Sequence, residues 1–127
     1  MTGVLFLFSA LLGILFLQSG VDKIVDRAGN LAWLTGHFKE SPLASMVPLM
    51  VSIITVMEIA AGGISALGAA ALVTTGTKTI GVVGALLSGA TLVCLFFGQR
   101  MAKDYAGGET LAGYFTLVMV GTYLYLV

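Results

Sequence analysis

The sequence predicts an all-α fold: an integral membrane four-helix bundle with up-down-up-down connections, and a short interfacial helix between its first and second spans. The first reason is composition, because the chain is 58% hydrophobic and 9% charged. A soluble domain is about 25% charged, so these polar residues are too few to cover a soluble surface. The second reason is that four apolar segments approach the roughly 20 residues that a helix needs to cross a bilayer core. Short connections between them favour antiparallel neighbours, and we expect residues 1–127 to form one transmembrane domain.

The first span is predicted over residues 4–28. Residues 4–17 are almost entirely apolar, and helix-forming residues continue for three more turns. When those turns are drawn at 100° per residue, apolar side chains occupy one side and polar side chains the other. The polar side carries Gln18, Asp22, Lys23, Asp26 and Arg27. We therefore expect the helix to continue to Ala28, with Gly29 and Asn30 as its stop. This polar side is interpreted either as a solvated helix end with weak ion pairs or as the wall of a pocket.

A short helix at the membrane surface is predicted next. Leu31, Leu34 and Phe38 recur at helical spacing, but the segment is too short to cross a bilayer, which favours an interfacial position. His37 lies beside them and is a candidate for proton transfer; the alternative is an ordinary hydrogen-bonded surface histidine. Because the chain contains a single histidine, the sequence predicts no metal site.

Three further spans are predicted over residues 46–73, 80–98 and 110–127. Pro48 falls in the first turn of the second span, where its missing N–H is tolerated. Small residues repeat every four positions in the second and third spans, and such repeats let helix backbones approach closely in a membrane. They are Gly62, Ala66 and Ala70 in the second span, and Gly81, Ala85 and Gly89 in the third.

Glu58 is the strongest indication of a site. It lies near the middle of the second span, between long apolar runs. A carboxylate at that depth costs about 2.5–3.5 kcal/mol on insertion scales, so it is expected to face the protein interior. The cations within reach are Lys23, Arg27 and Arg100. Two interpretations stay open: a functional carboxylate, or a structural pair such as Glu58 with Lys23 that fixes the helix register.

A second polar cluster follows the third span, in "FFGQRMAKDYAGGE". It contains Gln99 and Arg100 and falls on the same side of the membrane as the charged end of the first span. One interpretation is a solvated loop. The other is that both clusters and His37 meet at one end of the bundle, with Glu58 below them, around a cavity that opens toward the charged side.

Charge and cysteine content exclude two classes of function. The formal net charge is zero, so no excess of positive charge indicates a nucleic-acid partner. Cys94 is the single cysteine. One thiol can form no internal disulfide and no CxxC pair, which excludes thiol–disulfide exchange by this chain alone.

The distribution of Lys and Arg predicts an orientation. Five of the six lie in the connections on one side, and Lys78 lies alone on the other. The positive-inside rule then places the charged connections in the cytoplasm and both termini outside. The five are Lys23, Arg27, Lys39, Arg100 and Lys103.

The pattern resembles the DoxX family of small four-helix membrane proteins along nearly the whole chain. The matching motifs are "LFLQSGVDKIVD", with Gly20 and Lys23 as a G-x-x-K element, then Glu58 before a Gly/Ala-rich half-helix, and "QRMAKDYAGGETLAGYF". The resemblance implies a four-helix bundle and an oxidoreductase role, since some members are subunits of membrane thiosulfate:quinone oxidoreductase or act with redox proteins. Relatives with paired cysteines carry out disulfide chemistry, and this sequence lacks the pair.

Two functional hypotheses follow. In the first, the chain is a subunit of a redox-associated complex in a bacterial-type inner membrane, and its cavity binds a quinone or a small substrate. Glu58 and His37 would handle protons. A partner would supply the electrons, since no redox centre is evident. Ligand contacts would come from the cations Lys23, Arg27 and Arg100 and from the amides Gln18 and Gln99.

The alternative is a non-catalytic accessory or structural subunit of a larger membrane assembly. Its helix faces would be the interface, and its polar cluster would lock the bundle, with a bound lipid. In both cases the expected partners are membrane lipid and other membrane protein subunits, not nucleic acid. A transporter is a weaker third hypothesis, because there is no inverted repeat and only one mid-span carboxylate.

Overall fold

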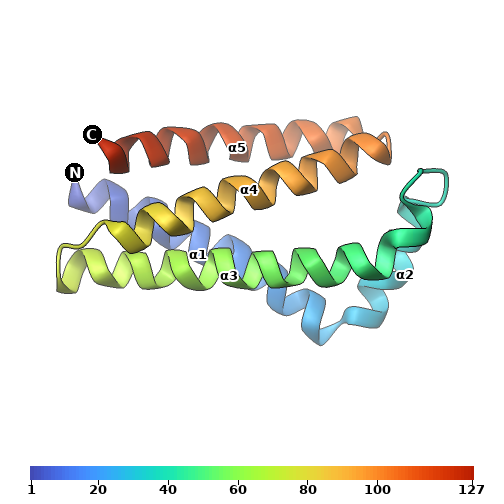
Figure 1. Ribbon diagram of the computed structural model, residues 1–127, viewed down its shortest axis with the longest axis horizontal. Coiled ribbons are helices and arrows are strands. Elements are labelled where there is room, and N and C mark those ends of the chain that lie inside the picture. The colour runs from blue at the N-terminus through green and yellow to red at the C-terminus, as the bar shows by residue number, and fades with distance from the viewer.

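The computed structural model describes residues 1–127, and the fold is entirely helical. This confirms the all-α prediction. The chain forms five α-helices and one short 3₁₀ turn, and Figure 1 shows how the helices are arranged. They are α1 (Thr2–Val25), α2 (Arg27–His37), the 3₁₀ turn η1 (Ala44–Met46), α3 (Val47–Thr74), α4 (Thr79–Met101) and α5 (Tyr105–Leu126).

Three helices are long and apolar enough to cross a membrane, which supports a membrane protein. They are α1, the continuous segment Ala44–Thr74 that includes α3, and α4. The last helix, α5, is not among them, although the sequence predicted a span there. Its glycines and tyrosines and the acidic Glu109 dilute its apolar residues.

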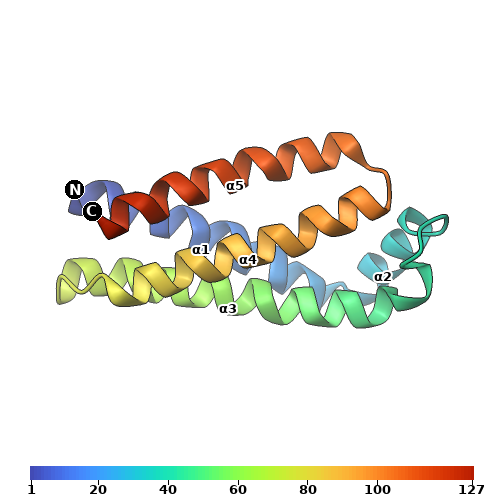
Figure 2. The ribbon, with the colours of Figure 1, turned by 45° about the horizontal axis from the view of Figure 1, so that its top comes forward.

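The long helices lie along one another, and the short helix α2 lies at one end of the molecule (Figure 1). Both termini and the α3–α4 connection lie at the other end, as Figures 1 and 2 show. In the middle of the arrangement, α3 packs against both α1 and α4, while α5 packs mainly against α4. The end opposite the termini carries α2, η1 and the α4–α5 connection. Five of the six Lys and Arg residues therefore belong to this end.

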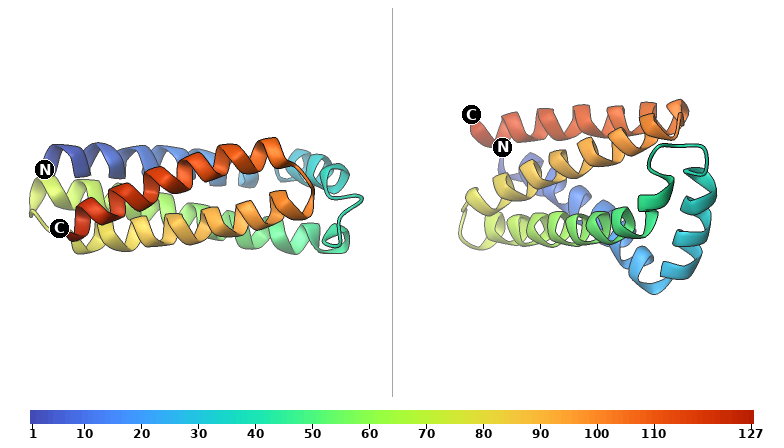
Figure 3. Two further views of the ribbon diagram at one scale, coloured as in Figure 1. Left: turned by 90° about the horizontal axis from the view of Figure 1, so that it is seen from above. Right: turned by 45° about the vertical axis from the view of Figure 1, so that its right-hand side comes forward.

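The prediction that the first helix runs unbroken to Ala28 is wrong. The helix α1 ends at Val25, and Asp26 leaves the helical conformation with φ −118° and ψ 51°. The carboxylate of Asp26 accepts a hydrogen bond from the Gly29 backbone N–H at 3.2 Å, so Asp26 caps the start of α2. Aspartate is a preferred residue at this capping position, because its carboxylate accepts a hydrogen bond from the backbone N–H groups of the first helical turn. Gly29 and Asn30 thus form the first turn of α2 instead of ending α1, and α2 turns away from α1 (Figure 3).

A second capping aspartate moves the start of the last helix. The α5 helix begins at Tyr105, whereas the sequence predicted residue 110. The carboxylate of Asp104 accepts a hydrogen bond from the Gly107 backbone N–H at 2.9 Å. The α4–α5 connection is therefore only three residues long, and Lys103 within it adopts a positive φ of 60°. This tight connection holds the ends of α4 and α5 together.

Small residues allow α3 to touch both of its neighbours. A Cβ at Gly62 would lie 2.6 Å from the backbone nitrogen of Leu17 in α1, and a Cβ at Gly68 would lie 2.6 Å from the Cα of Gly81 in α4. Real Cβ atoms do not approach this closely, so both contacts require glycine. Ala70, the last member of the repeat predicted in the second span, is exposed. The face of α3 that meets α4 thus uses Gly68 and not the predicted stripe.

Candidate functional site

Glu58 lies in the interior of the protein, as predicted for a carboxylate in mid-span. It is 1% exposed in the middle of α3. The Lys23 Nζ of α1 lies 2.9 Å from Glu58 Oε1 and also donates a hydrogen bond to Ser19 Oγ at 3.0 Å. The contact with Glu58 is an ion pair without hydrogen-bond geometry, because Oε1 has no hydrogen-bond partner. Of the cations considered from the sequence, Lys23 is the one that meets this carboxylate.

Gly20 explains why this pair can form. A Cβ at Gly20 would lie 3.2 Å from the backbone nitrogen of Ile59 and 2.7 Å from its Cδ1. The missing side chain therefore lets α1 approach α3 directly beside Glu58. Lys23 lies three residues after Gly20, on the same face of the helix. The spacing of the G-x-x-K element thus has a physical meaning in this chain.

Arg27, Arg100 and Gln18 are exposed, and none of them forms an ion pair or hydrogen bond with Glu58. The guanidinium of Arg27 donates hydrogen bonds to Ser52 Oγ at 3.0 Å and to the Pro48 carbonyl at 3.5 Å, on the exposed start of α3. Arg100 is exposed and stacks over the ring of Tyr105, 4.6 Å from its centroid. Gln18 is exposed on α1. The hypothesis that these three side chains line the site is not supported by their positions.

His37 joins the end of α2 to α4 and α5. Its Nε2 lies 3.0 Å from Gln99 Oε1 and 3.5 Å from Asp104 Oδ2. Both oxygens are acceptors, so Nε2 carries a hydrogen and donates it to Gln99. The imidazole also stacks on Trp33, with 4.6 Å between ring centroids, and meets the edge of Phe38. The contacts of Nε2 with Gln99 and Asp104 join α2 to the end of the bundle.

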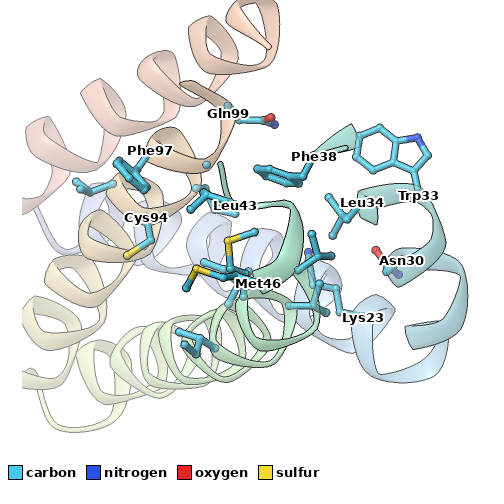
Figure 4. Close-up of a pocket in the computed structure, with 18 residues that line it drawn as sticks. Lys23, Asn30, Trp33, Leu34, Phe38, Leu43, Met46, Cys94, Phe97 and Gln99 are labelled. Carbon is cyan, nitrogen blue, oxygen red and sulfur yellow. The ribbon is translucent and has the colours of Figure 1, made fainter. Parts of the chain in front are cut away.

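A pocket of about 750 Å³ lies beneath α2, between the start of α3 and the last turns of α4 (Figure 4). This volume is within the range of about 300–1,000 Å³ that is usual for ligand sites. Of its 18 lining residues, 14 are hydrophobic, and the polar side chains are those of Lys23, Asn30 and Gln99. The sequence predicted a polar cavity at this end. The cavity is instead mostly apolar, because Arg27 and Arg100 are exposed at the protein surface.

Two of the three polar lining side chains, Lys23 and Asn30, lie on one side of the pocket, and the opposite side, formed by α4, is apolar except for Gln99 (Figure 4). In Figure 4, Lys23, Asn30 and Trp33 lie on one side of the pocket, and Cys94 and Phe97 lie on the opposite side. Two lining side chains at the apolar side, Val93 and Phe97, are 54% and 56% exposed. The apolar side therefore continues into the outer surface of α4, a helix that is apolar enough to face lipid.

The predicted site residues thus divide into three groups. Lys23 and Gln99 line the pocket directly. Glu58 and His37 are not part of the lining but contact lining residues: Glu58 contacts Lys23, and His37 contacts Gln99 and Trp33. The exposed Gln18, Arg27 and Arg100 are not part of its lining. Sequence reasoning missed Asn30, which was interpreted as a helix stop; its amide donates a hydrogen bond to the Asp26 carbonyl at 2.9 Å, and no sequence pattern marks it as a pocket residue.

No family model, curated protein or solved structure matches the chain. The resemblance to the DoxX family therefore stays a prediction. The function has to be argued from the pocket and its polar groups.

Proposed function

We propose that this chain is a DoxX-like subunit of a redox-associated membrane complex and that it binds a lipid-soluble ligand, a quinone or a small substrate, in the pocket under α2. The observation that carries the proposal is the pocket itself: about 750 Å³, mostly apolar, with Lys23 and Gln99 at its polar positions. Such a combination of a large apolar lining and a few oriented polar groups is typical of small-molecule sites.

The polar groups suit a ligand that carries carbonyl oxygens. Gln99 uses its Oε1 to accept from His37, which leaves its Nε2 as a donor for a ligand. The Lys23 ammonium has three N–H groups, and Ser19 is its one hydrogen-bond acceptor in the protein. Met46 and Met50 line the apolar part, and methionine adapts its shape to irregular apolar ligands.

In this proposal Glu58 and His37 are positioning residues. Glu58 holds Lys23 at the pocket wall, and His37 holds Gln99. Glu58 and His37 do not line the pocket, so the proposal gives them no direct proton transfer to the ligand. Electrons would come from a partner subunit, because Lys23, Asn30 and Gln99 carry no redox chemistry of their own.

The membrane arrangement belongs to the same proposal. In it, α1, α3, α4 and α5 cross a bacterial-type inner membrane as an up-down-up-down bundle, and α2 lies at the interface. The end that carries α2 faces the cytoplasm because it holds five of the six Lys and Arg residues. Both termini then lie outside.

The proposal is tested by identifying what the protein retains from its own membrane. The wild-type chain is purified in mild detergent, and bound molecules are extracted and identified by mass spectrometry. Cys94→Trp places a large side chain at the pocket wall, and Ala90→Trp places the same side chain one turn away on the exposed face of α4, outside the lining. We expect wild type and Ala90→Trp to retain a quinone or another lipid-soluble molecule and Cys94→Trp to lose it. Equal retention by all three proteins would contradict the proposal.

A non-catalytic accessory subunit is the second candidate. The observation that favours it is that Lys23 and His37 are already engaged within the protein: Lys23 with Glu58, and His37 with Gln99 and Asp104. The two candidates differ in the response of the parent complex to Glu58→Gln. A complex that assembles normally but loses activity favours ligand chemistry, whereas a complex that keeps its specific activity but assembles in lower yield favours the accessory role.

A further inference from the structure

We propose that Glu58 sets the charge selectivity of the pocket: by neutralising Lys23, it makes the pocket bind an amphiphile with an uncharged, oxygen-bearing headgroup in preference to an anionic one. This inference rests on the proposed function, because it assumes that the pocket binds a lipid-soluble ligand. It adds the chemical class of that ligand. It also names a specificity residue that does not itself line the pocket.

Lys23 belongs to both the ion pair and the pocket. Its ammonium lies 2.9 Å from Glu58 Oε1, while its side chain is part of the pocket lining and appears on the same side as Asn30 in Figure 4. Glu58 lies behind it, with a side chain that is 2% exposed. A ligand in the pocket therefore contacts Lys23 directly. Glu58 affects the ligand only by neutralising the charge of Lys23.

The charges of the pair cancel. The Lys23 ammonium and the Glu58 carboxylate together carry no net charge. No other charged residue lines the pocket; Arg27 is engaged with Ser52, and Arg100 stacks on Tyr105. An anionic headgroup would thus lose its hydration without gaining a free countercharge, and this is costly in an apolar site. A neutral headgroup loses less and can still accept hydrogen bonds from Lys23 and Gln99.

The shape of the pocket indicates that the ligand is an amphiphile. Lys23 and Asn30 lie on one side of the pocket, and the opposite side, formed by α4, is apolar except for Gln99 (Figure 4). On that side Val93 and Phe97 are more than half exposed. Those residues lie on α4, a helix long and apolar enough to cross a membrane. A single apolar chain can thus extend from the Lys23 side of the pocket toward the bilayer, and the ligand can enter from the side.

Binding of two probes with the same apolar chain and headgroups of different charge tests the inference. Hexadecyl methyl sulfone and hexadecanesulfonate have the same chain and similar sulfonyl oxygens, but only the second is anionic. Binding of each is measured by competition on the full chain in phosphatidylcholine nanodiscs. We expect wild type to prefer the neutral sulfone. In Glu58→Gln the uncompensated Lys23 should shift the ratio of the two dissociation constants toward the sulfonate by about tenfold, or ~1.4 kcal/mol.

Two further variants keep the test decisive. Glu109→Gln removes an exposed carboxylate of α5 outside the pocket and should leave the ratio unchanged. The double variant Lys23→Met with Glu58→Gln removes both charges and should keep the wild-type preference for the sulfone. It provides a folded protein even if Glu58→Gln alone is unstable, because replacing both partners of a buried pair is tolerated better than replacing one.

The outcomes separate this inference from the proposed function. If wild type binds neither probe, the proposed function fails, and the inference fails with it. If wild type binds both probes but prefers the sulfonate, or if the ratio is the same in Glu58→Gln as in wild type, only the charge-selectivity inference is overturned. A sulfonate preference in the double variant would overturn it as well, since that variant has no cation in the pocket lining.

Discussion

Lys23 of α1 and Glu58 of α3 lie 2.9 Å apart at the point where Gly20 lets the two helices touch. This is the one ion pair that joins two of the helices long and apolar enough to cross a membrane. The pair has two consequences. It keeps a carboxylate neutralised in the protein interior, and it holds an amine at the wall of the pocket under α2.

The two partners of the pair should differ in their contribution to stability. Lys23→Met leaves the Glu58 carboxylate buried without a countercharge, and we expect the free energy of unfolding to fall by about 3–5 kcal/mol. Glu58→Gln should cost less, because the Lys23 side chain is 16% exposed and can turn its charge toward polar surroundings. Denaturation in SDS, followed by circular dichroism, measures both changes.

The double variant of Lys23→Met and Glu58→Gln is the control for this prediction. It should recover most of the stability lost in Lys23→Met, which gives a large coupling energy in the mutant cycle. Strictly additive losses would show that the pair contributes nothing as a pair.

The contact between α3 and α4 predicts a strong dependence on glycine. Gly68→Ala would place a methyl group 2.6 Å from the Cα of Gly81, so the helices must separate, at a cost of about 1–3 kcal/mol. Gly63 lies on the same helix with nothing within 4 Å of an added Cβ. Gly63→Ala should therefore be neutral or stabilising by about 0.5–1 kcal/mol, because alanine favours the helix. Thermal unfolding in detergent compares the two; similar losses in both variants would argue against this close contact.

The docking of α2 should depend on His37. The helix has no fully buried residue, and the contacts of His37 with Gln99 and Asp104 join its C-terminal end to α4 and to the start of α5. We expect His37→Ala to raise amide exchange rates across residues 27–37 by up to about tenfold. The variant loses one hydrogen bond, which contributes about 1 kcal/mol to the free energy of opening this segment. Hydrogen exchange with mass spectrometry resolves this segment. The control is Thr35→Ala, at an exposed position of the same helix, which should leave the exchange rates unchanged. Unchanged rates in His37→Ala as well would show that other contacts hold α2 in place.

The proposed orientation predicts where a C-terminal tag will be found. Five of the six Lys and Arg residues lie at the end opposite the termini, so a tag after Val127 should be reached by a protease added outside intact cells. A tag cut only after the cells are permeabilised would invert the orientation. Removing the positive charge of Lys23 alone or of Arg27 alone should not change the orientation of the protein, since the other cations at that end remain.

The helical fold and the position of Glu58 could be predicted from the sequence because each follows from a strong, local signal. Long apolar runs have few ways to satisfy their backbone in a membrane other than as helices. A carboxylate inside such a run must face the interior, and Lys23 was one of few cations able to reach it. The choice between Lys23, Arg27 and Arg100 required the structure, because it depends on how closely α1 and α3 approach at Gly20.

The break after Val25 and the character of the pocket could not be predicted in the same way. Helix periodicity continues through Asp26, and the chain bends there because its carboxylate caps α2. That bend turns the polar side chains that follow onto a separate helix. Arg27 then meets the start of α3, while Asn30 lines the pocket. The apolar lining comes from residues distant in sequence, such as Met46 and Val93, and no local pattern reveals that they share one cavity.

The most direct test of the central claim, that the pocket binds a lipid-soluble ligand, uses Cys94 as its reporter. It is the single cysteine, it is free, and it lines the pocket. The rate of its alkylation by N-ethylmaleimide is measured in proteoliposomes at rising concentrations of decylubiquinone. The control is Cys94→Ser combined with Ala90→Cys, which places the thiol one turn away, outside the pocket. We predict that the quinone slows alkylation of Cys94 in a saturable manner and leaves the control unchanged. An unchanged rate at Cys94, or equal slowing at both positions, would contradict the account.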